Sequence, residues 1–504
     1  MGNSTSATKE ALPIDTSFKL PSPLPSLPQG EGFGNGVINL GGGLQVCQIV
    51  SLSKIWATNE GGPGNLGATF FEPSQVPQGF SMLGCYSQPN NRMLHGWVLA
   101  GKDETGEALK KPIDYTLVWS SGSLQIKQEG VGYIWLPTPP DGYKALGCVV
   151  TTSPEKPSLE KVRCARSDLT DDCQADKWIW GQGKESDPNG FNVFSLRPSS
   201  RGAQAMGVSV GTFVAQETTS ASISLACLKN IESDLSCMPT LDQVQTIFQA
   251  YSPRIYFHPD EEYLPSSASW YFTNGALLYK KDEESAPAPI EPTGSSLPQG
   301  GSNDGLYWLD LPMEEAERER VKRGRFTILP GQHVGDWEHA TLRISNFNGQ
   351  LRAIYLSAHS GGAWYDASEL EFQSGNRAVA YSSLNGHAMY AKPGLVLQGS
   401  GNIGIRNDTA KSEKFIDTGA RFSVVAAEYM GSSIIEPPWL NYLRKWGPNI
   451  TYDIAEEVAT VENLLPGKLK SAFDKVVKSL PREIFGEEGP TGPKLKRNWI
   501  GDEV

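Results

Sequence analysis

An internal repeat in the first half of the chain constrains the fold more than any other feature of the sequence. Three segments share a glycine, an apolar residue four positions later and a second glycine one position after that. These segments begin at Gly79, Gly142 and Gly202. A tryptophan recurs in step with them, at Trp56, Trp119 and Trp180. Both markers give a period of 60 to 63 residues, so the sequence predicts a threefold structural unit.

The length of this period predicts small β-sheets. Most solenoid repeats are shorter, and each unit contains short alternating stretches, such as 115–119 and 133–136, that are typical of strands. Three small sheets around one axis form a β-prism, and we expect the recurring tryptophans to fill a shared core. The sequence therefore predicts a flexible lead-in over residues 1–36 and a β-prism-like domain of three repeats over residues 37–235.

A change of pattern after residue 235 predicts a second domain. Thr240-Leu-Asp-Gln243 has the form of a helix capping box, and apolar residues follow at helical spacing up to Pro253. Short strands are then expected, among them 351–358, 379–382 and 422–425. These strands favour an antiparallel β-sandwich over residues 236–450.

Two segments of this second half are expected to differ from the sandwich. Residues 280–304 are rich in Pro, Ser, Gly and acidic residues and lack periodicity, which predicts a disordered insertion. An apolar stripe between residues 469 and 480 predicts a C-terminal helical extension over residues 451–504 that ends in a loose tail. The expected fold class is therefore mainly β, with a threefold β-prism-like domain, an antiparallel β-sandwich and a helical extension.

Charge and cysteine content restrict the partners and the compartment. The formal net charge is −12 and no basic stripe is visible, which argues against nucleic acid as a partner. Seven cysteines without tight spacing indicate a reducing compartment and not a disulfide framework. The sequence has neither a run of 18 apolar residues nor the apolar core of a signal peptide, so we expect a cytoplasmic protein.

The N-terminus offers one route to a membrane. Met1-Gly-Asn-Ser-Thr-Ser6 matches the pattern for myristoylation of Gly2. A single myristoyl chain binds membranes only marginally, so stable attachment would need a second contact. We expect peripheral attachment to endomembranes or the plasma membrane, through membrane lipid headgroups.

One segment of the second half, Gly331 to Ile344, concentrates ligand-type side chains before an apolar strand. The two-residue period of a strand places Asp336 and Glu338 on the same face as Leu342. Two carboxylates that continue an apolar row need water, a cation or a basic partner, because burial of an unpaired charge is costly. His333 lies three residues before Asp336, and this donor set suits a divalent cation such as Ca²⁺ or Mg²⁺. The alternative is a salt-bridged loop, with Arg325, Arg343 or Arg352 as partners.

Three further histidines are candidate ligands for the same cation. His359 and His387 each lie beside a glycine at a predicted strand end, and His258 precedes a proline and two acidic residues. Each of these side chains can equally hydrogen-bond a backbone carbonyl or order a loop.

The central segment resembles the heptapeptide of the NLP-type necrosis-inducing toxins that act on plants, in which His, Asp and Glu have the same relative spacing. The resemblance implies that His333, Asp336 and Glu338 hold a divalent cation at one pole of a β-sandwich. Val334 and Gly335 replace the Arg and His of the toxin motif, and the upstream acidic ligand of the toxins has no evident counterpart.

A longer series of motifs resembles the plant family of vacuolar protein sorting-associated protein 62. The motifs span 254–266, 333–344, 359–362, 385–388, 404–408 and 436–440. The resemblance implies a role in vacuolar or endomembrane trafficking, with other trafficking proteins as partners.

The expected function is therefore that of a non-catalytic, membrane-associated protein with a divalent-cation site for a lipid or polar headgroup. One alternative is a metal-dependent hydrolase in which Glu338 or His339 acts as general base on a cation-bound water. The other is a membrane-perturbing effector related to the toxins. The sequence lacks H-E-x-x-H and P-loop motifs, which favours binding over catalysis.

Overall fold

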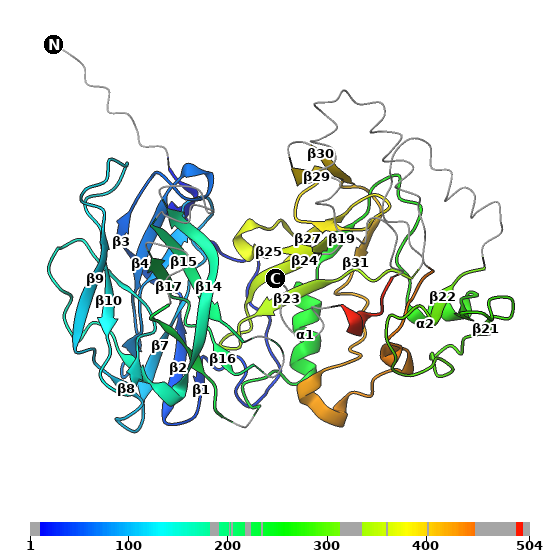
Figure 1. The fold of residues 1–504 in the computed structure, drawn as a ribbon, viewed down its shortest axis with the longest axis horizontal. Helices are drawn as coiled ribbons and strands as arrows, with labels where there is room; N and C mark the ends of the chain where they lie inside the picture. Colours follow the sequence, from blue (N-terminus) through cyan, green and yellow to red (C-terminus); the bar gives the residue numbers. More distant parts are fainter. Residues whose placement is uncertain are drawn as a thin grey trace, which may run out of the picture. The chain divides into compact units, whose positions relative to one another are not determined.

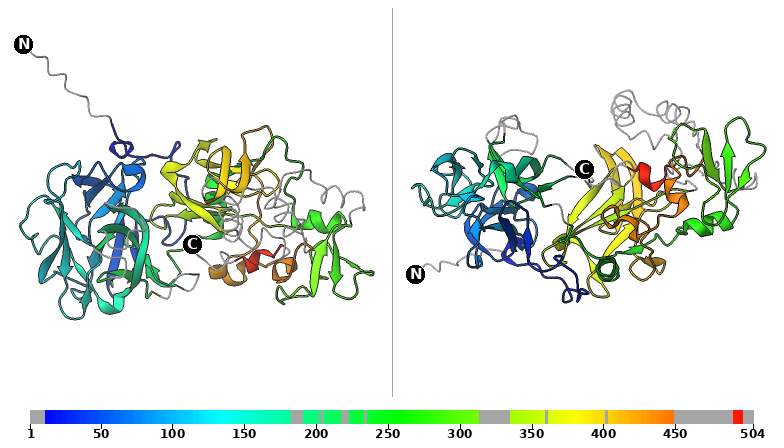
Figure 2. Two further views of the ribbon diagram at one scale, coloured as in Figure 1. Left: turned by 45° about the horizontal axis from the view of Figure 1, so that its top comes forward. Right: turned by 90° about the horizontal axis from the view of Figure 1, so that it is seen from below.

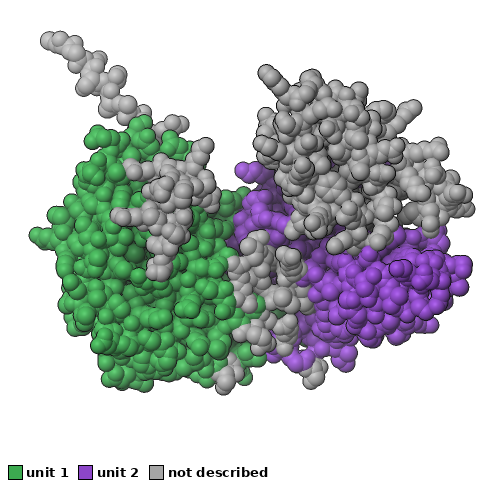
Figure 3. All heavy atoms as spheres, viewed as in Figure 1, with its two compact units in different colours: residues 1–246, 344–351, 366–369 green, residues 247–343, 352–365, 370–504 purple. Residues whose placement is uncertain are grey.

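The computed structural model describes residues 11–181, 191–200, 202, 205–216, 223–232, 235–312, 335–358, 361–400, 403–448 and 490–496. The fold is mainly β, as predicted, and most strand pairs are antiparallel (Figure 1). The chain divides into two compact units (Figure 3). Unit 1 comprises residues 1–246, 344–351 and 366–369, and unit 2 comprises residues 247–343, 352–365 and 370–504.

Three antiparallel sheets in unit 1 correspond to the three sequence repeats. In each sheet the strand that carries the repeated tryptophan pairs with a second strand, which pairs with a third. The first sheet contains β3 (Leu52–Ala57), β4 (Ala68–Pro73) and β6 (Tyr86–Pro89). The second contains β9 (Asp114–Ser120), β10 (Tyr133–Thr138) and β12 (Val149–Thr151). The third contains β14 (Thr170–Gly181), β15 (Asn192–Pro198) and β17 (Phe213–Gln216).

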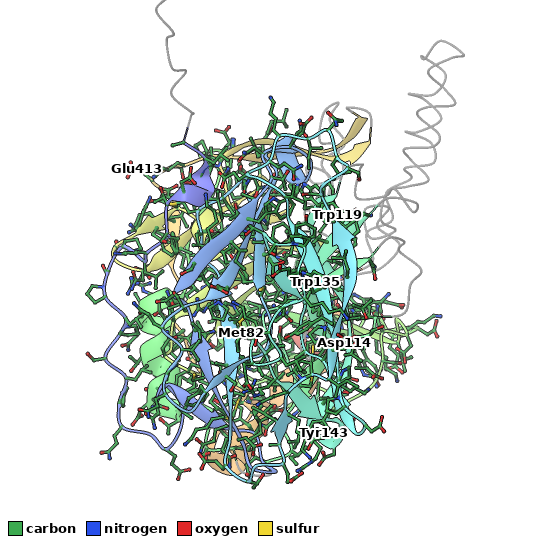
Figure 4. The ribbon with its side chains drawn as sticks, turned by 90° about the vertical axis from the view of Figure 1, so that its left-hand side faces the viewer. Met82, Asp114, Trp119, Trp135, Tyr143 and Glu413 are labelled. Carbon is green, nitrogen blue, oxygen red and sulfur yellow. The ribbon has the colours of Figure 1, made fainter. Side chains whose placement is uncertain are left out.

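The repeated tryptophans pack against one another in the core of unit 1. The ring centroid of Trp56 lies 5.9 Å from that of Trp119 and 6.3 Å from that of Trp180, and the last two are 5.4 Å apart. Trp56 and Trp180 are fully buried. Figure 4 shows Trp119 on β9, beside Trp135 of β10. The regular spacing of the tryptophans in the sequence therefore reflects their packing in one core. The β-prism is an interpretation of this arrangement.

Further strands complete unit 1 (Figure 2). They are β1 (Val37–Asn39), β2 (Leu44–Ile49), β5 (Ser81–Met82), β7 (Val98–Asp103), β8 (Leu109–Lys110), β11 (Tyr143–Lys144), β13 (Cys164–Arg166), β16 (Gly207–Val208) and β18 (Ala226–Lys229). Within each repeat, one of the two-residue strands β5, β11 and β16 comes before the last strand of the sheet described above.

The glycine motif holds in two repeats and shifts in the third. A Cβ added at Gly84 or Gly147 would lie 2.7 or 2.6 Å from the Thr212 side chain, so these three positions meet. Thr212 precedes β17 as the two glycines precede β6 and β12. The third equivalent is therefore Thr212 and not Gly207, because the third repeat has a longer link before its last strand.

Helix α1 (Leu241–Tyr251) begins at the predicted capping box. The backbone N–H of Thr240 donates to Gln243 Oε1 at 2.9 Å, and the N–H of Gln243 donates to Thr240 Oγ1 at 3.3 Å. This reciprocal pair satisfies donors that the first turn leaves unpaired. The boundary between the two units falls within α1, between Thr246 and Ile247.

Unit 2 contains several small sheets. Its further elements up to residue 366 are β19 (Arg254–Tyr256), α2 (Ala268–Thr273), β20 (Leu277–Lys280), β21 (Ala288–Pro289), β22 (Tyr307–Asp310), β23 (Ala340–Ile344), β24 (Leu351–Ala358) and β25 (Gly361–Asp366). They are followed by β26 (Phe372–Gln373), β27 (Arg377–Ser382), β28 (Met389–Tyr390), β29 (Gly394–Ser400), β30 (Ile403–Thr409) and β31 (Phe415–Asp417). Strand β24 and the end of β27 match the predicted strands, whereas residues 422–425 form no strand. The pair β19 and β27 is parallel, unlike the expected antiparallel arrangement.

The segment 280–304 differs from the expected disordered insertion. Strand β21 pairs with β20, and Ile290 and Leu297 are buried in a cluster with Phe272 and Trp446. Turns formed by the polar residues connect these anchors. Composition alone suggested disorder because only two apolar side chains, placed seven residues apart, fix this segment to the rest of unit 2.

Most of the predicted helical extension lies outside the described residues. Of residues 451–504, the structure describes 490–496. These residues are packed, unlike the loose tail that was expected: Trp446 N donates to Pro490 O at 2.7 Å, and Lys494 Nζ donates to Glu436 Oε2 at 2.5 Å. This segment contains a 3-10 helix, η8 (Pro493–Leu495). Among the described residues, no helix has the length and apolarity needed to cross a bilayer.

A candidate carboxylate site before strand β23

Two carboxylates, Asp336 and Glu338, lie on an extended segment immediately before β23. The expected strand therefore begins later than the alternation suggests, at Ala340. Gly335 opens the segment with a φ of +81°, and a Cβ at this position would overlap the carbonyl oxygen of Trp446. Only glycine meets both requirements without strain.

Glu338 is held against β24. Ser357 Oγ, from that strand, donates a hydrogen bond to Glu338 Oε2, and the N–H of His339 donates to Ser357 Oγ at 3.1 Å. Burial and the nearby charge of Asp336 raise the pKa of Glu338 from the ordinary 4.5 to about 8, against the lowering effects of Ser357 and Lys496. The site thus disfavours the ionised form of Glu338 at neutral pH.

Asp336 has a basic neighbour from the C-terminal segment. Lys496 Nζ lies 3.5 Å from Asp336 Oδ1. The side chains are partly exposed, 30% for Lys496 and 27% for Asp336. The sequence offered three arginines as basic partners for the carboxylates, and this lysine was not among them. One ammonium group therefore stands opposite two carboxylates, which is consistent with the raised proton affinity of Glu338.

Trp337, between the two carboxylates in the sequence, belongs to an aromatic cluster. The ring of Trp337 stacks on Trp439 at 5.5 Å and meets Trp446 edge-on at 5.1 Å. Tyr390 of β28 interacts electrostatically with Glu338. Burial, then Tyr365 and then the charge of Glu338 raise the pKa of Tyr390 to about 12. The Tyr390 hydroxyl is buried and accepts or donates no hydrogen bond within the described part of the chain.

The ring of His339 lies flat against Tyr355, with centroids 5.5 Å apart and planes at 23°. Burial, and then the positive charge of Lys496, lower the pKa of His339 to about 4. His339 is therefore neutral at pH 7.

The other candidate histidines have partners of their own. His387 Nε2 lies 3.3 Å from Oε2 of Glu261, a buried carboxylate that also accepts the N–H of Asn385 at 2.7 Å. His258 Nδ1 accepts the N–H of Asp260 at 3.2 Å. His333 and His359 lie outside the described residues, as does Gly2. Within the described ranges, no three His, Cys, Asp or Glu side chains converge as a metal site.

Sequence reasoning missed three groups of this site, namely Ser357, Tyr390 and Lys496. Ser357 had a usable signal, because it is a polar residue near the end of a largely apolar, buried strand. Tyr390 and Lys496 had none, since each belongs to a segment far from Glu338 in the sequence.

Comparisons with known proteins bear on the family. The sequence model of the family described as vacuolar protein sorting-associated protein 62 matches residues 14–329 and 327–503. The comparison with curated proteins gave no match. Among solved structures, the crystal structure of GNIP1Aa from Chromobacterium piscinae aligns with 19% identity and a TM-score of 0.29, over 36% of this chain and 37% of that chain. Because the family match extends over most of its length, the chain belongs to the vacuolar protein sorting-associated protein 62 family, and its role is related to vacuolar sorting.

Proposed function

We propose that the chain is a non-catalytic protein of vacuolar sorting that attaches peripherally to membranes, and that Asp336 and Glu338 form its headgroup site by holding a divalent cation. The observation that carries the proposal is the excess of carboxyl groups over ammonium groups at this site. Two carboxylates share one ammonium group, Lys496, at 3.5 Å from Asp336. A bound cation would offset the burial of Glu338 and its repulsion by Asp336, which together raise the pKa of Glu338.

The residues present fit an oxygen-binding cation better than a nitrogen-binding one. Asp336 and Glu338 supply carboxylate oxygens, and the buried Tyr390 hydroxyl is a neutral oxygen near Glu338. His387 and His258 have their own partners in Glu261 and Asp260. Such a donor set suits Ca²⁺ or Mg²⁺ more than Zn²⁺. His333, outside the described residues, would add one nitrogen.

The cation would also explain how an acidic protein meets an anionic membrane. With a formal net charge of −12, the protein is repelled by anionic lipid as a whole. A divalent ion at Asp336 and Glu338 reverses the local field and leaves coordination positions for a headgroup oxygen. Myristoylation of Gly2 would add the second contact that a single acyl chain needs.

Terbium luminescence tests the cation step directly. Trp337 neighbours both carboxylates in the sequence, so its excitation should sensitise Tb³⁺ bound in place of Ca²⁺. We expect the signal in the wild type and its loss in Glu338→Gln, with retention in Glu413→Gln, which makes the same substitution at an exposed carboxylate of unit 2 (Figure 4). Equal luminescence in all three proteins would contradict the proposal.

A lysine substitution distinguishes a cation site from a structural salt bridge. If Lys496 competes with the cation for Asp336, Lys496→Met should bind Tb³⁺ and Ca²⁺ more tightly than the wild type. If the cluster is only a salt bridge, this variant should lose stability without binding either ion. Isothermal titration calorimetry with Ca²⁺ separates these outcomes.

Sedimentation with liposomes tests the membrane step. Wild-type protein with Ca²⁺ should sediment with phosphatidylserine vesicles and be released by EDTA, whereas Glu338→Gln should remain in the supernatant. Binding that is unchanged by EDTA and by this substitution would place membrane attachment elsewhere in the chain.

A metal-dependent hydrolase is the second candidate, because one observation favours it. The pKa of Glu338, near 8, suits a group that exchanges protons at neutral pH. Cation-dependent release of nitrophenol from nitrophenyl esters or phosphates, abolished in Glu338→Gln, would support this alternative.

A further inference from the structure

Two cysteines of unit 1 lie on neighbouring strands at positions from which their thiols can meet. Strand β14 pairs with β18 in the register Asp171↔Cys227 and Asp172↔Ala226. Cys173 is the next residue of β14, and its thiol donates to the carbonyl oxygen of Leu225 at 3.1 Å. Cys173 and Cys227 are thus diagonal neighbours across the strand pair, and their thiols hydrogen-bond each other.

The two thiols differ in exposure and in chemical character. Cys173 is half-buried, whereas Cys227 is 1% exposed. The hydrogen bond from Cys227 lowers the pKa of Cys173, with a further contribution from Lys144, while burial and Asp172 oppose the change. The pKa of Cys227 is raised by the same hydrogen bond and by burial. A reachable thiol of lowered pKa beside a buried thiol of raised pKa is the arrangement of an attacking and a resolving cysteine.

The surroundings of Cys173 include a lysine on another strand. Lys144 belongs to β11, which Tyr143 marks in Figure 4, and its Nζ lies 3.9 Å from Asp172 Oδ1. The other buried thiols lack the exposure that oxidation requires. Burial raises the pKa to about 11 for one of them and about 12 for the rest, namely Cys47, Cys85, Cys148 and Cys164.

We propose that Cys173 and Cys227 form a redox-sensitive dithiol, in which Cys173 reacts with a peroxide and Cys227 closes a reversible disulfide between β14 and β18. In the first step the Cys173 thiolate attacks one oxygen of hydrogen peroxide and the O–O bond breaks. The products are a sulfenic acid at Cys173 and hydroxide, which takes up a proton to become water. In the second step the Cys227 sulfur attacks the Cys173 sulfur, and hydroxide leaves and combines with the Cys227 proton as a second water.

The disulfide would link strands β14 and β18 of unit 1, which pair along their backbones at only three residue pairs. Strand β14 pairs with β15 in the third repeat, and β18 carries the short strand β16 on its other side. A thiol as the external reductant would restore the dithiol by exchange. The reducing compartment expected from the cysteine content is compatible with such a reversible bond and not with a permanent one.

Mass spectrometry of the full chain after mild peroxide treatment tests the proposal. We expect a loss of about 2 Da, a cross-linked peptide pair containing Cys173 and Cys227, and recovery of the original mass with dithiothreitol. In Cys227→Ala the disulfide cannot form, so Cys173 should accumulate sulfenic acid that dimedone traps. Cys173→Ser should lose both products.

Cys237 provides the matched control, because it is the other half-buried cysteine among the described residues. Cys237→Ser should form the disulfide at the wild-type rate. The proposal is overturned if wild-type protein shows no loss of mass, if the cross-link joins other cysteines, or if dimedone labels Cys237 as fast as Cys173 in Cys227→Ala. The wild-type peptide map decides the outcome even if a variant fails to fold.

Discussion

Replacing Glu338 with glutamine should flatten the dependence of stability on pH. The pKa of Glu338 is about 8 in the folded chain, compared with an ordinary value of 4.5. Between these values, raising the pH removes the proton from the unfolded state only, so the unfolded state is favoured. The unfolding free energy of the wild type then falls by about 1.4 kcal/mol for each pH unit.

The size of the effect follows from that interval. At pH 7 the unfolded-state pKa has been passed by about 2.5 units, which corresponds to about 3 kcal/mol lost relative to acidic pH. Stability should stop falling above about pH 8, where the folded state also releases the proton. Glutamine has no proton to lose but can still accept the Ser357 hydrogen bond, so Glu338→Gln should gain stability over the wild type as the pH rises.

Urea unfolding at several pH values measures this difference. Tryptophan fluorescence reports on unit 2 through Trp337, Trp439 and Trp446, together with the tryptophans of unit 1. The difference between variant and wild type isolates Glu338 from other titrating groups. Glu413→Gln serves as the control and should run parallel to the wild type. Parallel curves for Glu338→Gln from about pH 5 to 8 would refute the raised pKa. If Ca²⁺ binds at Glu338, saturating Ca²⁺ should reduce the slope of the wild type.

Three further substitutions test the packing and another buried carboxylate, Glu261. Gly335→Ala should destabilise unit 2 by about 1–3 kcal/mol in urea, because φ is +81° and the added methyl would overlap the Trp446 carbonyl. Trp56→Ala should cost about 3–5 kcal/mol, seen as a lower unfolding temperature of unit 1 by calorimetry, because Trp56 is fully buried. For Glu261, burial raises the pKa, but hydrogen bonds from His387 and two backbone N–H groups outweigh burial and lower it overall. The wild type should therefore lose stability as the pH falls below the ordinary pKa of Glu261, and Glu261→Gln should lose less between about pH 5 and 3 in urea midpoints.

Local patterns in the sequence predicted much of the fold. The tryptophan period anticipated three equivalent sheets because Trp56 and its equivalents occupy the same place on each first strand. The capping box placed the start of α1, because both of its hydrogen bonds join residues three positions apart. The segment 280–304 was beyond such reasoning, because its order depends on β20 and on aromatic residues distant in the sequence.

The candidate site could be predicted only in part. The alternation from Asp336 identified the two carboxylates, and their need for a positive partner followed from the cost of burying charge. The partner itself could not be identified, since Lys496 reaches Asp336 through the fold of residues 490–496. The late start of β23 was also unpredictable, because Gly335 and the Trp446 carbonyl fix the backbone there.

The charge of the site depends on the packing of the C-terminal segment. Pro490 accepts the Trp446 N–H at 2.7 Å, and Lys494 is held by Glu436 and Asn441, so the backbone that leads to Lys496 is anchored before η8 and within it. Trp446 also contacts Trp337, the residue between the two carboxylates. Trp446 is therefore tied both to the segment that carries Lys496 and to the segment that carries the two carboxylates. A perturbation of Trp446 would change the position of the ammonium group and with it the proton affinity of Glu338, because the charge of Lys496 lowers the pKa of Glu338.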